Sequence, residues 1–230
     1  MHTDSHPDSS NHLIVKLTKT VFQALWTVFI LSAGIVGGVY VFSLWGESLS
    51  QILMTTDKHF WYLSRASGVI AYALFWLAIV FGLLLSTRLC RYFNAAKVFA
   101  LHQYLSLLAV GFATFHAVIL LADNYMNLNV WQVLLPLGFQ TDRIGVALGQ
   151  LGFWFLFISA FSFYLKKHLG QSAWRWLHFL TFLAYMGISI HVFMVGSDSR
   201  LLAPSLFYAG SQTVVFVLIA YRLYALRQVS

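Results

Sequence analysis

The sequence predicts an all-α, polytopic membrane protein built as a bundle of six transmembrane helices. Of its 230 residues, 60% are hydrophobic and only 9% are charged, whereas soluble domains carry about 25% charged residues. The mean hydropathy is +0.75. Six stretches reach the roughly 20 apolar residues that a helix needs to cross the hydrocarbon layer. They are 20–44, 61–86, 98–122, 145–165, 175–196 and 205–224.

The first stretch, 20–44, is longer than the core of a signal peptide and has no small-residue cleavage signature, so we expect a retained span. Residues 1–12 have the polar composition of a disordered tail, and residues 13–230 are expected to form one six-helix domain. The external connection 123–144 contains the apolar run VWQVLLPLGF, which we expect to lie flat in the interface or to act as a lid. Two glycine pairs have the four-residue spacing of close helix packing, namely Gly34 with Gly38 and Gly145 with Gly149.

The basic residues predict how the helices are oriented. With the N-terminus inside, ten of the 14 Lys and Arg residues lie on the internal face, as the positive-inside rule requires. They are Lys16, Lys19, Arg88, Arg91, Lys97, Lys166, Lys167, Arg175, Arg222 and Arg227. Both termini are then cytoplasmic, and the other face is slightly acidic. The pI near 9.6 therefore reflects topology and not nucleic-acid binding. The single cysteine, Cys90, excludes an intramolecular disulfide.

Four of the nine histidines lie inside expected spans. His102 and His116 are 14 residues apart in the third span, and His178 and His191 are 13 apart in the fifth. These intervals correspond to about 21 and 20 Å along a helix axis, most of the thickness of the hydrocarbon core. Because both spans run from inside to outside, His102 shares a level with His178 near the cytoplasm, and His116 shares one with His191 near the outer surface.

Two imidazoles held across a helix bundle can supply both axial ligands of a haem iron, so the two levels predict two stacked b-type haems. Zinc is less favoured, because two histidines without carboxylates at the same depth fall short of four ligands. A single buried histidine is more often simply hydrogen-bonded to a neighbouring helix, but four at matched depths favour ligation.

One geometric feature resists this scheme. At 100° per residue, 14 steps return to within about 40° of the starting face, whereas 13 steps miss it by about 140°. The fifth span is therefore expected to be distorted, or its haems to be offset around it. Gly187 lies between the two histidines and either permits a kink or serves packing.

The segments LSRASG (63–68), LHQYLSLLAVGFATFH (101–116), LGQSAWRWLHFLTFLAYMGISIH (169–191) and GSDSR (196–200) resemble the ferric reductase-like transmembrane domain superfamily. That superfamily includes ferric reductases, NADPH oxidases and stand-alone bacterial haem-binding membrane subunits. The resemblance covers residues 60 to 224. It implies that His102 and His178 hold an inner haem, that His116 and His191 hold an outer haem, and that electrons pass from a cytoplasmic flavin to an external acceptor. No segment of the sequence resembles the family's C-terminal FAD and NAD(P)H domains, so we expect the chain to be closer to the stand-alone subunits.

Arg65 is expected about one turn inside the second span, where an unpaired cation is costly. The resemblance places it beside the outer haem, whose propionates would supply negative charge. The alternative is a side chain that snorkels to the interface. Arg143 and Arg200 are weaker outer candidates. Several aromatic residues near the histidines, Phe112, Phe115, Tyr185 and Trp176, are more simply explained by packing or lipid contact.

Two functions from different classes remain open. The first is the haem-binding membrane subunit of an oxidoreductase in the cell membrane, with a bacterial inner membrane expected. It would take electrons from a cytoplasmic flavin reductase, with FAD or FMN, or from a quinol, and pass them to a periplasmic oxidoreductase, a ferric complex or oxygen. The second is a haem-free transporter or proton conductor that uses the four imidazoles as a relay.

Overall fold

The computed structural model describes residues 58–87, 94–123 and 126–227. All of the described residues belong to one compact unit, Lys58–Ser230. The expected tail 1–12, the expected span 20–44 and the glycine pair within that span lie outside the described residues.

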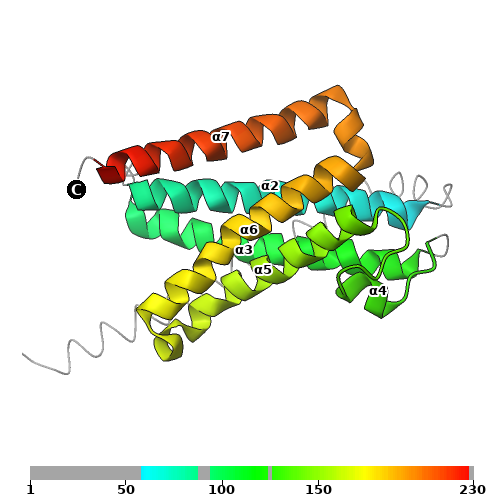
Figure 1. Ribbon diagram of the computed structural model, residues 1–230, viewed down its shortest axis with the longest axis horizontal. Helices are drawn as coiled ribbons and strands as arrows, with labels where there is room; N and C mark the ends of the chain where they lie inside the picture. The colour runs from blue at the N-terminus through cyan, green and yellow to red at the C-terminus, as the bar shows by residue number, and fades with distance from the viewer. Residues whose placement is uncertain (1–57, 88–93, 124–125, 228–230) are drawn as a thin grey trace, which may run out of the picture. The chain divides into compact units, whose positions relative to one another are not determined.

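Five long helices make up most of this unit (Figure 1). They are α2 (His59–Thr87), α3 (Ala95–Ile119), α5 (Arg143–Leu169), α6 (Gln171–Val195) and α7 (Leu202–Arg227). Three short elements occupy the connections: η2 (Leu120–Ala122), α4 (Val130–Leu134) and η3 (Ser197–Arg200).

All five long helices are long and apolar enough to cross a membrane, with 18-residue windows of mean hydropathy between 1.6 and 2.5. The described part of the chain is thus that of a multi-pass membrane protein. The five expected spans from 61–86 onward are confirmed as helices, each within a few residues of its expected ends. Their agreement has a simple cause: a helix in lipid satisfies its own backbone hydrogen bonds, so an apolar run of sufficient length specifies it.

The helices pack as two antiparallel hairpins and one further helix. Helix α2 lies along α3, α5 lies along α6, and α7 packs against α2. Figure 1 shows that α5 and α6 run obliquely across α2 and α3. Seen in that view, α6 begins on one side of α3 and ends on the other. This oblique crossing decides which faces of α3 and α6 meet.

Local sequence explains where several helices begin and end. Asn94 precedes α3, and its side chain accepts hydrogen bonds from the backbone N–H groups of Ala96 and Lys97 at 3.0 and 3.3 Å. Gly170 alone separates α5 from α6 and has a φ of +80°, a left-handed conformation that glycine adopts without steric penalty. The chain therefore reverses direction within one residue.

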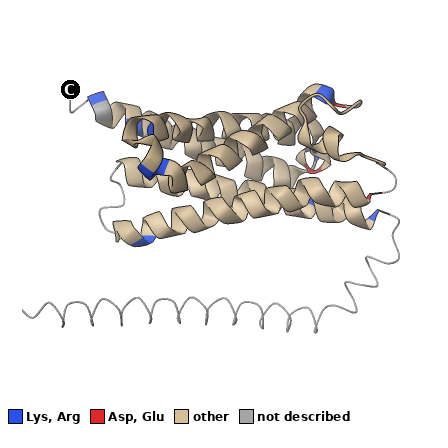
Figure 2. Ribbon diagram, turned by 90° about the horizontal axis from the view of Figure 1, so that it is seen from below, with Lys and Arg blue, Asp and Glu red and all other residues tan. Residues whose placement is uncertain are grey.

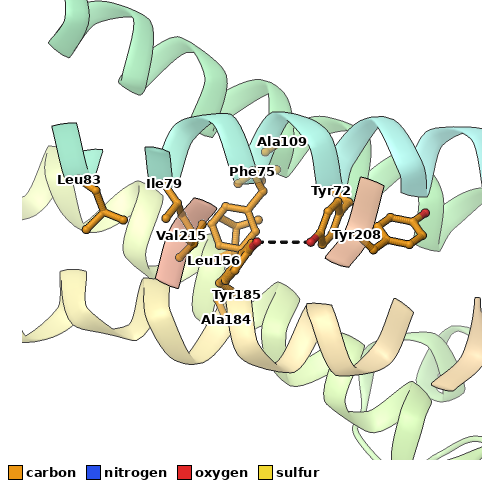
Figure 3. Close-up of a cluster of buried hydrophobic side chains, with 11 residues drawn as sticks. Tyr72, Phe75, Ile79, Leu83, Ala109, Leu156, Ala184, Tyr185, Tyr208 and Val215 are labelled. Carbon is orange, nitrogen blue, oxygen red and sulfur yellow. Dashed lines mark hydrogen bonds between the residues drawn. The ribbon is translucent and has the colours of Figure 1, made fainter. Parts of the chain in front are cut away.

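The core between α2, α6 and α7 lies midway along the helices. Tyr72, Phe75 and Tyr185 are at most 5% exposed and pack against one another there (Figure 3). The Tyr72 hydroxyl lies 2.5 Å from Ser211 Oγ and accepts a 2.7 Å hydrogen bond from Gln212 Nε2. This buried polar group is thus paired, as burial in an apolar bundle requires.

Charged residues mark the two ends of the helices. Figure 2 shows acidic residues gathered at one end, and these are Asp123, Asp142 and Asp198. At the opposite end, where α2, α5 and α7 terminate, the described charged residues are all basic: Lys97, Lys166, Lys167, Arg175, Arg222 and Arg227. This is the asymmetry on which the expected orientation depends.

Candidate metal-binding histidine pairs

The four histidines of the expected spans meet in two cross-helix pairs. The ring centroids of His102 on α3 and His178 on α6 are 6.2 Å apart, with an angle of 77° between the ring planes. Those of His116 and His191 are 6.5 Å apart at 76°. The structure thus brings together the residues that were paired by depth alone.

These separations suit one ion between two rings. A metal lies about 2.0–2.1 Å from an imidazole nitrogen, and that nitrogen lies about 1.2 Å from its ring centre. Two imidazoles on opposite sides of an ion therefore have centroids about 6.4–6.6 Å apart, close to the 6.2 and 6.5 Å of the two pairs. Two rings that pack directly, without an ion between them, can have similar centroid separations. The separation therefore permits ligation, and the hydrogen bonds of the ring nitrogens are needed to distinguish the two cases.

Both histidines of α3 are anchored through Nδ1 to main-chain carbonyls of α2. His102 Nδ1 is 2.8 Å from the carbonyl oxygen of Ala78, and His116 Nδ1 is 2.7 Å from that of Ser64. The hydroxyl of Ser64 also donates to the His116 carbonyl at 3.0 Å. A carbonyl only accepts hydrogen bonds, so both Nδ1 atoms must be donors.

The histidines of α6 are held by α5 in two different ways. His191 Nδ1 donates to the carbonyl oxygen of Gly145 at 2.9 Å. His178 Nδ1 has only a 3.5 Å contact with the hydroxyl of Ser159, which in turn lies 2.5 Å from Thr181 Oγ1. The His178 ring is also stacked on Trp174, with centroids 5.3 Å apart and planes 20° apart.

Three of the four rings therefore carry a proton on Nδ1, and in the neutral form of each ring the lone pair is on Nε2. Their Nε2 atoms keep a free lone pair, and within the described residues no hydrogen bond reaches Nε2 of any of the four. Histidines that bind metals commonly have this arrangement, with the second ring N–H donated to a carbonyl. The His116–His191 pair has this arrangement on both rings, and the His102–His178 pair has it on His102.

A cavity of about 320 Å³ lies at the pair formed by His102 and His178. His102 and His178 line it, together with Phe163 and Trp174. The indole Nε1 of Trp174 is buried without a hydrogen-bond partner, and Lys166 Nζ lies 4.3 Å from the centre of the Trp174 ring. Because the lining is rich in aromatic side chains, a large, flat, mainly apolar group would pack well in this cavity.

Arg65 forms an ion pair that the sequence did not indicate. Its Nη2 bonds Asp198 Oδ1, and its Nε donates to Asp198 Oδ2 at 3.0 Å. The guanidinium carbon lies 4.3 Å from the centre of the Trp61 ring. The expected unpaired cation is therefore paired within the protein, and this pair joins the LSRASG and GSDSR segments. Two of its five N–H donors are used in the pair, so the guanidinium can still donate to a further acidic group.

The expected distortion of the fifth span is absent, since α6 is one continuous α-helix from Gln171 to Val195. The 13-residue spacing is instead accommodated by the oblique crossing of α6 over α3 (Figure 1). Because α3 lies on opposite sides of α6 at its two ends, histidines on different faces of α6 both point toward α3. A Cβ on Gly187 would lie 3.0 Å from the carbonyl oxygen of Leu148 on α5, so this glycine serves packing.

Other residues near the pairs take simpler roles. Trp176 and Phe115 are 74% and 46% exposed, as expected of lipid-facing side chains. Among the described residues, the aromatic side chain stacked on a paired histidine is Trp174, which no sequence pattern indicated. In the described ranges no three His, Cys, Asp or Glu side chains gather closely enough to hold a metal ion, whereas zinc usually takes four ligands.

Comparison of the chain with protein-family models, with curated proteins and with solved structures found no match. The resemblance to the ferric reductase-like superfamily therefore rests on four sequence segments, from LSRASG at 63–68 to GSDSR at 196–200.

Proposed function

We propose that this protein carries electrons across a membrane through two b-type haems, as the membrane subunit of an oxidoreductase of the ferric reductase-like kind. The observation that supports the proposal most strongly is the repeated geometry of the histidine pairs. At both levels, two rings from different hairpins lie 6.2–6.5 Å apart, and three of the four rings donate Nδ1–H to a main-chain carbonyl of the neighbouring helix.

In this proposal His102 and His178 hold the inner haem, and His116 and His191 hold the outer haem. A haem with two histidine ligands is low-spin and accepts and releases single electrons. Arg65 would donate to a propionate of the outer haem in addition to Asp198. Trp174 Nε1 and Lys166 would donate to the propionates of the inner haem.

Partners follow from the expected topology. We expect the protein to lie in the cell membrane, with six spans and both termini on the cytoplasmic side. The His102–His178 pair would then be the one nearer to a cytoplasmic flavin reductase or a quinol. The basic residues Lys166, Lys167 and Arg175 lie at that end and would attract an acidic donor surface. The outer pair would deliver electrons to a periplasmic oxidoreductase, and a ferric complex or oxygen are the alternatives.

One observation favours a second candidate, a haem-free proton conductor. A buried polar cluster lies between the two histidine levels, in which Gln212 Nε2 bonds both Tyr72 Oη and Ser189 Oγ at 2.7 and 2.9 Å. Figure 3 shows the same tyrosine directed at Tyr185, with the two hydroxyls 3.4 Å apart. Such a chain of hydroxyls can pass protons between titratable rings.

An absorption spectrum before and after dithionite separates the two candidates. We expect the purified protein to bind about two haems per chain and to show a reduced-minus-oxidised b-type α-band. A colourless protein, expressed with ample haem, would exclude the electron carrier and leave the proton conductor.

Single substitutions then test the ligands. His116→Ala and His102→Ala should each lower the haem content from about two to about one per chain. His168→Ala, which changes a histidine at the end of α5 outside both pairs, is the matched control and should keep two. Unchanged haem content in the two ligand variants would contradict the assignment.

A further inference from the structure

Three of the four paired histidines face a glycine on the neighbouring helix of their own hairpin. A Cβ on Gly68 would lie 2.8 Å from His116 Nδ1, and one on Gly149 would lie 2.6 Å from His191 Nδ1. A Cβ on Gly82 would lie 3.2 Å from His102 Cε1 and 3.4 Å from its Nδ1. Each of these imidazoles thus occupies space that any other residue type would fill.

The same three histidines donate to a main-chain carbonyl. The accepting residue and the glycine are the same number of positions apart in all three cases. The carbonyl that accepts from Nδ1 belongs to the residue four positions before the glycine: Ser64 before Gly68, Ala78 before Gly82, and Gly145 before Gly149. In an α-helix each Cβ tilts toward the N-terminus, over the preceding turn. Omitting the Cβ at the fourth position therefore uncovers that carbonyl for a ring from the next helix.

Other glycines of the described helices do not share this arrangement. A Cβ on Gly152 would meet Ile188 and the Ala184 carbonyl, at 2.6 and 3.1 Å, which is helix-to-helix packing. At Gly111 and Gly210 a Cβ would meet no atom within 4 Å. Among the described glycines, contact with an imidazole is thus confined to the three that follow a histidine-bonded carbonyl.

The fourth histidine is held without such a glycine. His178 Nδ1 reaches the hydroxyl of Ser159 at 3.5 Å, and its ring orientation depends on the stacked Trp174. The 13-residue spacing on α6 explains the difference, because His178 meets α5 on another face than His191 does.

We propose that Gly68, Gly82 and Gly149 are positioning residues of the haem site: each uncovers the carbonyl that orients one axial histidine and fixes its Nδ1–H tautomer. The inference rests on the proposed function, since it assigns the purpose of this orientation to haem ligation. His178 is then the one ligand that a side-chain hydroxyl and an aromatic ring orient in place of a carbonyl.

The test replaces each glycine by alanine and measures haem content, together with carbon monoxide binding to the reduced protein. In Gly68→Ala and Gly149→Ala the new methyl group meets a side chain that can rotate, so the helices still pack while the ring leaves its carbonyl. We expect the outer haem to be lost, about two haems falling to about one, or to become five-coordinate and bind carbon monoxide. Gly82→Ala, with its longer contacts, should have the smaller effect, at the inner haem.

Two controls separate orientation from general packing. Gly111→Ala on α3 should leave both haems unchanged and unable to bind carbon monoxide. Gly152→Ala should destabilise the α5–α6 hairpin, and any haem loss should then affect both levels equally. A wild-type protein without haem would overturn the proposed function itself. Two haems in the wild type, together with two six-coordinate haems in Gly68→Ala and Gly149→Ala, would overturn this inference alone.

Discussion

The ion pair between Arg65 and Asp198 allows a quantitative prediction, because it joins the start of α2 to the short helix η3 before α7. The side chains are 28% and 21% exposed, so the pair is intermediate between fully exposed and fully buried ion pairs. Exposed pairs contribute about 0.2–1 kcal/mol, and breaking a fully buried pair costs about 3–5 kcal/mol. Two hydrogen bonds and partial burial place the coupling free energy at about 1–2 kcal/mol, or roughly a 5–30-fold change in the unfolding equilibrium constant.

A double-mutant cycle measures this coupling. The variants are Arg65→Gln, Asp198→Asn and the double variant, and the quantity compared is the free energy of unfolding in mixed detergent micelles. The matched control uses Arg143→Gln with Asp198→Asn. Arg143 lies at the same end of the helices as Arg65, but its Nε donates to the carbonyl oxygen of Leu137 at 3.0 Å. Its coupling to Asp198 should be within about 0.3–0.5 kcal/mol of zero.

The result that refutes the reasoning is a coupling between Arg65 and Asp198 no larger than that of the control pair. Arg65 would then stabilise the protein through Trp61 or through a bound acidic group, and the link between α2 and η3 would have no energetic significance.

Three other substitutions have effects that the contacts determine. Gly152→Ala forces a methyl group to within 2.6 Å of Ile188 Cγ1 and should lower the free energy of unfolding by about 1–3 kcal/mol. An unchanged value would show that α5 and α6 can move apart without cost. Tyr72→Phe removes a hydroxyl whose partners keep other bonds, Gln212 to Ser189 and Ser211 to the Tyr208 carbonyl, so thermal unfolding should show a loss of only about 1–2 kcal/mol. Gly170→Ala places a Cβ at a φ of +80° and should cost about 1–2 kcal/mol in the same assay; a stabilised variant would contradict this account of the turn.

Much of the membrane fold was predictable from the sequence. Apolar length alone located α2, α3, α5, α6 and α7, because a helix in lipid must satisfy its backbone groups internally and has no alternative pairing to choose. The same counting along the axis placed His102 level with His178 and His116 level with His191, because the rise per residue of an α-helix is constant.

The direction in which each histidine points around its helix axis was not predictable in this way. The 13-residue spacing on α6 conflicted with a parallel packing of helices, and the oblique crossing of α6 over α3 resolved it without any distortion of the helix. Crossing angles depend on which side chains interdigitate along both helices, so they belong to the pair and not to either sequence segment.

The sequence by itself determined the five described long helices and the levels along them at which the four histidines lie, since these follow from hydropathy and the constant helical rise. Only the tertiary structure decided which carbonyl each imidazole binds, that Gly68, Gly82 and Gly149 make room for the rings, and that Arg65 pairs with Asp198. The 14-residue spacing from Gly68 to Gly82 repeats that from His102 to His116. That signal acquires its meaning only once α2 and α3 are seen to be packed in antiparallel register, because contacts between helices depend on register and rotation, which no single segment encodes.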